Sequence, residues 1–196
     1  MIARIGLVLG VLLLAGCATL TPAQERSAAE VRALADRTAR LYGLPPIHLL
    51  VSHNSQDPPG SYRGRFFSVS TITLTSTFRD AIVAHELAHY VLGHEAPLHG
   101  ASSGELERDY QQRELDANAK GVEILTRAAG FSEARALRAM YDYLAGVQWA
   151  LDRYPRLNLR GHKSPCEEIA DLLARFPQQR ALTAPLECAP VDFVGG

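Results

Sequence analysis

The chain has 196 residues, of which 47% are hydrophobic and 21% are charged, a composition typical of a folded globular domain. Its 20 Lys and Arg residues nearly balance its 21 Asp and Glu residues, and the basic residues are scattered along the chain. Disorder, collagen-like repeats and coiled coil are thereby excluded as fold classes. The charge also gives no basis for a nucleic-acid partner.

The N-terminal segment has the features of a signal peptide. A positive start at Arg4 precedes an apolar run over residues 5–14 that is too short to span a bilayer comfortably, and small residues precede Cys17. The order Leu-Ala-Gly-Cys resembles the bacterial lipoprotein box, which implies cleavage after Gly16 and a membrane anchor made of acyl chains on Cys17. The alternative is a plain secretory signal with a chance cysteine.

This interpretation divides the chain into three parts. We expect a signal peptide over residues 1–16, a lipidated tether over 17–27 and a single domain over 28–196. Because Ala18 follows the cysteine, the lipoprotein resemblance implies the periplasmic face of the bacterial outer membrane.

Hydrophobic periodicity and turn residues predict the elements of the domain in chain order. The first half should contain a helix over Gln24–Tyr42 that stops at Gly43, a short strand over Ile47–Ser52, a loop over Asn54–Gly64 and a strand over Phe66–Thr75 with a bulge between Val69 and Ile72. Thr77 and Asp80 then match a capping box, which predicts a helix running to Leu92 and stopping at Gly93.

The second half reads as helical. Apolar spacing predicts helices over Leu106–Ala128, Ser132–Leu151 and Pro165–Phe176, the last with a proline in its first turn. The fold class is therefore a mostly helical α+β domain with a small sheet.

Two cysteines, Cys166 and Cys188, remain once Cys17 is assigned to the anchor. In an oxidising periplasm an even pair predicts a disulfide bond. The alternative is two free buried thiols.

The candidate chemistry lies on the helix that stops at Gly93, which carries His85-Glu86-Leu87-Ala88-His89. Residues four apart share a helical face, so the imidazoles of His85 and His89 can converge on one metal ion. Glu86, one residue after the first ligand, can act as a general base beside that metal. His94, just past the helix end, is expected to interact with the last carbonyls and the helix dipole, with a metal role as the alternative.

A catalytic zinc site uses three protein ligands, so a third residue is required. Glu114, Ala117, Asn118 and Gly121 share one face of the next helix. Glu114 is the candidate third ligand, the alternative being a solvated charge. Small Ala117 and Gly121 would let the two helices approach, and Asn118 could hydrogen-bond a ligand.

The pattern His-Glu-Leu-Ala-His, followed by a helix with Glu-x-x-Ala-Asn, resembles the HtpX-like and CAAX-prenyl-protease-like zinc metallopeptidases. The resemblance implies a zincin-like domain with the sheet beside the zinc helix, and one Zn²⁺ per chain. Asn118 stands where the family has Asp.

A further match near the C-terminus runs from His162 to Ile169, with the family's spacing between these two residues. The resemblance implies that His162 faces the active site and steadies the oxyanion. Lys163 replaces the family's Pro after the histidine, and Glu168 replaces a frequent Arg.

The function expected from these patterns is a zinc metalloendopeptidase of the bacterial envelope that acts on unfolded or misassembled polypeptides. The strand predicted over Phe66–Thr75 would pair with an extended substrate. The alternatives are a zinc-bearing chaperone or scaffold lipoprotein that serves an envelope-assembly partner with negligible turnover, and a structural lipoprotein with a coincidental motif.

Overall fold

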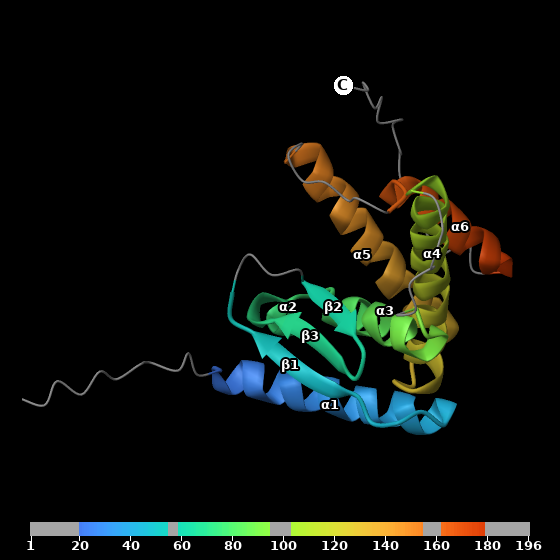
Figure 1. The fold of residues 1–196 in the computed structure, drawn as a ribbon. Coiled ribbons are helices and arrows are strands. Elements are labelled where there is room, and N and C mark those ends of the chain that lie inside the picture. The colour runs from blue at the N-terminus through green and yellow to red at the C-terminus, as the bar shows by residue number, and fades with distance from the viewer. Residues whose placement is uncertain (1–19, 55–58, 95–102, 155–161, 179–196) are drawn as a thin grey trace, which may run out of the picture.

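The computed structural model describes residues 20–54, 59–94, 103–154 and 162–178 (Figure 1). Within them it is mostly helical with one small sheet, so the predicted α+β class is confirmed. The elements follow in the order α1 (Pro22–Tyr42), β1 (His48–Ser52), β2 (Gly60–Arg63), β3 (Phe66–Ser70), α2 (Thr71–Thr75), α3 (Arg79–Leu92), α4 (Ser103–Arg127), α5 (Glu133–Arg153) and α6 (Pro165–Arg175).

Helix α1 has strong local signals at both ends. Thr21 and Gln24 form a capping box, and Gly43 closes the helix in the left-handed conformation with φ of 65°. The tether expected over 17–27 is wrong from Pro22 onward, because these residues form the first turns of α1. Ser27 is buried there and donates a hydrogen bond to the carbonyl of Leu74 at 2.6 Å.

The sheet has three strands in the order β1-β3-β2, with β1 parallel and β2 antiparallel to the central β3. Strand β2 lies inside the segment that was expected to be a loop over Asn54–Gly64. Its short, polar sequence has no apolar alternation, so only pairing with β3 identifies it as a strand.

The strand predicted over Phe66–Thr75 is too long, and the predicted bulge does not exist. Strand β3 ends at Ser70, whose hydroxyl accepts a hydrogen bond from the Thr73 backbone N–H and starts the short helix α2. A side-chain cap therefore outweighs the β propensity of the residues that follow.

Helix α3 ends at Gly93, as predicted, with φ of 66°. The capping box predicted at Thr77 and Asp80 is wrong. The N-cap residue is Phe78, which makes no side-chain capping bond, and the Asp80 carboxylate pairs with Arg79 instead.

Helices α4, α5 and α6 are found close to their predicted bounds and gather at one end of the molecule, while α1 lies along the sheet (Figure 1). Helix α3 packs against α4 at Gly121, where a Cβ atom in place of the glycine hydrogen would lie 3.5 Å from the backbone nitrogen of His85. The predicted close approach of these helices is therefore confirmed.

One buried core includes residues from all parts of the described chain. Its largest fully buried apolar side chains are Phe67, Leu87, Ile124, Leu125, Leu137, Met140 and Leu172. Among the described residues no helix is long and apolar enough to cross a membrane. The expected signal peptide over 1–16, with Cys17, lies outside the described residues.

Candidate metal centre

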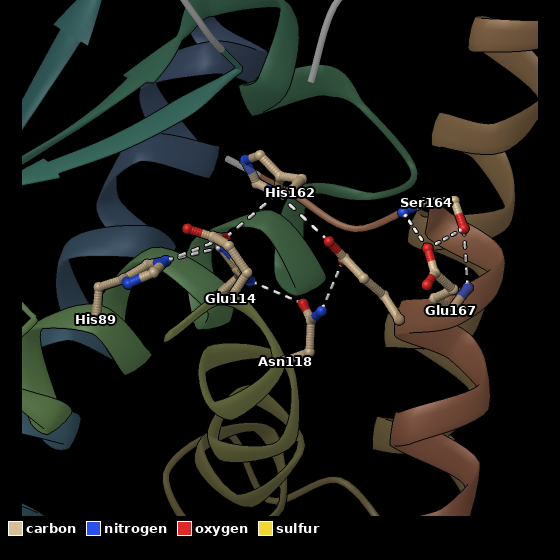
Figure 2. Close-up of polar contacts among 8 residues, drawn as sticks. His89, Glu114, Asn118, His162, Ser164 and Glu167 are labelled. Carbon is tan, nitrogen blue, oxygen red and sulfur yellow. Dashed lines mark hydrogen bonds and ion pairs between the residues drawn. The ribbon is translucent and has the colours of Figure 1, made fainter. Parts of the chain in front are cut away.

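Three side chains from two helices converge in one cavity. His85 and His89 lie one turn apart on α3, and their Nε2 atoms are 3.1 Å apart. Glu114 on α4 places its Oε2 atom 3.0 Å from Nε2 of His85 and 3.5 Å from Nε2 of His89 (Figure 2). The two predicted histidines and the predicted glutamate are thus brought together.

This cluster could hold a metal ion. Ligand atoms about 2.0–2.2 Å from a tetrahedral zinc ion would be separated from one another by about 3.3–3.6 Å, within a few tenths of an ångström of the three observed distances. Moreover, Oε2 of Glu114 is one of the few buried side-chain oxygens, among the described residues, that receive no well-directed hydrogen bond. A cation between the three atoms would satisfy it.

The charges of the cluster are coupled in the metal-free protein. Burial by itself lowers the pKa of His85, but the close contact with Glu114 and its charge outweigh burial and raise this pKa to about 9. Burial favours the neutral form of Glu114, yet the close contacts with His85 and His89 hold its pKa well below the usual range. The two shifts have the same cause, because each group favours the charged form of the other.

Each candidate histidine ligand has a partner for its other ring nitrogen. Nδ1 of His85 lies 2.9 Å from Oδ1 of the buried Asn118, so the predicted supporting role of Asn118 agrees with the geometry. Nδ1 of His89 lies 2.9 Å from Nδ1 of His94. Such partners leave Nε2 of both rings directed at the metal position.

His94 makes the helix-end contact predicted for it and also contacts the ring of His89. Its backbone N–H donates to the His89 carbonyl at 3.0 Å, as expected at a helix end. Burial and the nearby charges of His89 and Arg113 lower the pKa of His94 to about 4, so its ring is neutral and its Nδ1 can accept a hydrogen bond from the Nδ1–H of His89. It is not part of the three-residue ligand cluster found in the described chain.

Glu86 lines the same cavity as the three ligands. Burial raises the pKa of its carboxyl group, and the histidines nearby oppose that shift. Gly60 of β2 packs directly on it, since a side-chain carbon at that position would lie 2.8 Å from Cγ of Glu86. Sequence reasoning missed Gly60 because β2 itself was not predicted.

The cavity has a volume of about 530 Å³ and opens beside the edge strand β2. Tyr143, Leu144 and Val147 of α5 give it an apolar wall, and Arg113 of α4 also lines it. A cavity of this size is typical of a binding site for an organic substrate, and most of the side chains that line this one are polar or charged.

His162 also lines the cavity and is 35% exposed in its side chain. Its Nδ1 atom lies 3.6 Å from Oε2 of Glu114 and 3.4 Å from Oε1 of Glu168, and the contact with Glu168 raises the pKa of His162. The structure therefore places His162 beside the ligands, as the sequence match implied.

Sequence reasoning did not select Glu168 as a site residue, yet its carboxylate is buried between His162 and Asn118. The sequence nevertheless contained an indication that Glu168 is a buried, partnered charge. Glu168 shares the apolar face of α6 with Pro165, Ile169 and Leu172, and a charge on a buried helical face requires a partner.

Of the remaining predicted residues, Cys166 lies in the first turn of α6 and is disulfide-bonded. Cys188, its expected partner, and Cys17, the expected lipidation site, lie outside the described residues.

Searches with this chain match no protein-family model, no curated protein and no solved structure.

Proposed function

We propose that this protein is a zinc-dependent endopeptidase of the bacterial cell envelope, with a zincin-like domain. The observation that supports the proposal is the convergence of His85, His89 and Glu114 in a cavity that also contains the carboxylate of Glu86. Two imidazoles and one carboxylate form a ligand set typical of catalytic zinc, which leaves one coordination position open.

When bound, zinc would polarise the scissile carbonyl and lower the pKa of a water molecule at the open position to about 7. Glu86 takes the proton of the attacking water and delivers it to the leaving amine. The raised pKa of Glu86 favours this exchange, because a carboxyl group titrating closer to neutrality both accepts and returns a proton readily.

His162 acts as a hydrogen-bond donor toward the developing oxyanion. Its ring lies beside Glu114 at the rim of the cavity, and the Glu168 carboxylate favours the protonated form of the imidazole. A hydrogen-bond donor held beside the candidate ligands would stabilise negative charge as it forms on the substrate.

The substrate is an extended polypeptide that lies beside β2. Pairing with β3, which was expected from the sequence, is ruled out because β3 is the central strand and is paired on both sides. Strand β2 is at the sheet edge, and Pro59, Gly60 and Tyr62 line the cavity. Backbone pairing at this edge depends little on the amino-acid sequence of the substrate, which suits unfolded or misassembled envelope proteins.

The location of the proposed enzyme rests on the N-terminal sequence. Acyl chains on Cys17 would anchor the domain to the periplasmic face of the outer membrane. Metabolic labelling with a radioactive fatty acid tests this anchor, and Cys17→Ser is expected to abolish the label.

Glu86→Gln tests the mechanism. We expect this variant to keep one zinc ion per chain and to lose peptidase turnover on unfolded casein by about 10²–10⁴-fold, because the proton acceptor is removed while the ligands remain. Glu107→Gln, the same change on the exposed face of α4, is the control and should be fully active.

Zinc content is measured by inductively coupled plasma mass spectrometry, and turnover is measured by the release of new amino termini from casein. Full activity of Glu86→Gln would contradict the mechanism. If Glu86→Gln lacks turnover but still performs the cellular role of the protein, that result would instead favour the alternative of a zinc-bearing scaffold lipoprotein.

A further inference from the structure

We propose that Glu168 is a positioning residue for the metal centre, which sets the orientation of the Asn118 amide and thereby the ring nitrogen that His85 offers to the metal. The inference rests on the metal site of the proposed function, and it does not depend on peptidase activity.

Glu168 is a buried carboxylate with few partners. Its side chain is on the inner face of α6, and only 4% of the residue is exposed. Oε2 accepts a hydrogen bond from Nδ2 of Asn118 at 2.9 Å, and Asn118 is 1% exposed. Because Oδ1 of Asn118 also lies 2.9 Å from Nδ1 of His85, the Asn118 amide lies between the carboxylate on α6 and the histidine ring on α3.

The carboxylate of Glu168 fixes the direction of the hydrogen bonds that run from Glu168 through Asn118 to His85. A carboxylate only accepts hydrogen bonds, so the amide of Asn118 must turn its NH₂ group toward Glu168 and its oxygen toward His85. An oxygen facing Nδ1 of His85 requires that Nδ1 carry a proton. The lone pair for a metal ion is then on Nε2, the atom that faces His89 and Glu114.

The opposite amide orientation would disable the ligand. It would place the amide oxygen against the Glu168 carboxylate and the NH₂ group against Nδ1 of His85. Nδ1 would then have to be the acceptor, and the proton of a neutral ring would move to Nε2, where it competes with the metal. Glu168 thus disfavours the orientation that weakens the site.

The second carboxylate oxygen of Glu168 has a separate role. Oε1 lies 3.4 Å from Nδ1 of His162, so one side chain links the Asn118 amide to the histidine at the cavity rim. Helix α6 supplies no metal ligand in the described chain, yet through Glu168 it contacts both sides of the centre.

Glu168→Gln is the first test. A glutamine side chain can donate as well as accept, so it no longer selects the amide orientation. We expect the zinc affinity of the purified full-length protein to fall about 10-fold or more, as measured by competition with a chromophoric chelator. Glu167→Gln is the matched control, because glutamine also serves in the capping box that Glu167 forms with Ser164 (Figure 2).

The second test is a rescue. Asn118→Asp alone places two carboxylates in contact and should weaken zinc binding. The double variant combines Asn118→Asp with Glu168→Gln. In it the new carboxylate at position 118 accepts one hydrogen bond from the new amide at position 168 and another from the Nδ1–H of His85. We expect the double variant to bind zinc more tightly than Asn118→Asp and within about threefold of the wild type, a non-additive result that mere packing would not give.

Circular dichroism and thermal unfolding identify any variant that fails to fold. Unchanged zinc affinity in folded Glu168→Gln, or a double variant that binds no better than Asn118→Asp, would overturn the inference. Absence of zinc binding in the wild type would overturn both the inference and the proposed function. Zinc binding without peptidase activity would contradict the proposed function alone.

Discussion

At the scale of single residues, the centre is built from groups that restrict one another's protonation. Glu114 raises the pKa of His85. Asn118 contacts Nδ1 of His85, and His94 contacts Nδ1 of His89. In the metal-free protein the result is a buried ion pair, and such a pair must affect folding stability as the pH changes.

The metal-free protein is expected to lose stability as the medium becomes alkaline. His85 has a pKa of about 9 when folded, against an ordinary value of 6.5, so the folded state binds the proton more tightly than the unfolded state. This contribution is fully present below pH 6.5 and disappears as the pH rises through about 9. The free energy of unfolding, measured by urea denaturation in the presence of a chelator, should fall by up to about 3 kcal/mol across that range.

Glu114→Gln is the control for this pH dependence, because it removes the charge that raises the pKa of His85. Its unfolding free energy should fall much less than that of the wild type from pH 6.5 to 9. A wild-type curve that is equally flat would show that the buried pair does not form.

At the scale of elements, the site depends on two close contacts with α3. Helix α4 approaches it at Gly121, and strand β2 approaches it at Gly60. At both positions a larger side chain would meet atoms of α3 or its neighbours, so glycine is needed for space and not for an unusual backbone angle.

Gly60→Ala is expected to displace the proposed general base while leaving the metal ligands in place. The new methyl group would lie 2.8 Å from Cγ of Glu86 and 2.9 Å from Cγ2 of Ile82, both too close for carbon atoms in contact. We expect kcat/KM for casein to fall at least about 10-fold, with the zinc content unchanged.

Gly104→Ala is the matched control, because beyond the neighbouring backbone of its own helix no atom lies within 4 Å of the added carbon. Full activity in Gly60→Ala would mean that Glu86 does not need its present position. Loss of zinc in that variant would mean that β2 supports the ligands as well as the base.

At the scale of the whole molecule, a metal ion would join two helices that follow one another in the sequence. His85 and His89 lie on α3 and Glu114 on α4, and α5 and α6 pack around them. A ligand that binds only the folded state stabilises the fold by mass action.

Zinc is therefore expected to raise the melting temperature of the chelator-treated protein. Free zinc at a thousandfold excess over Kd adds about 4 kcal/mol to the stability of the folded state. Differential scanning fluorimetry should show a large shift for the wild type and a much smaller one for Glu114→Ala, while exposed Glu107→Ala should behave as the wild type. A full zinc shift in Glu114→Ala would place the third ligand elsewhere.

The sequence by itself determined those features that depend on neighbours along the chain. Gly43 and Gly93 end their helices because a left-handed residue closes the last turn locally. His85 and His89 share a face because four residues make about one helical turn. Apolar periodicity identified α1, α4, α5 and α6 close to their observed bounds.

Only the tertiary structure decided the features that depend on distant partners. Strand β2 exists because β3 is beside it. The partnership of Glu168 with Asn118 joins helices that are far apart in sequence, at a distance and orientation that no local pattern encodes. Spacing therefore identified the residues that could bind a metal, whereas packing determined which groups orient them.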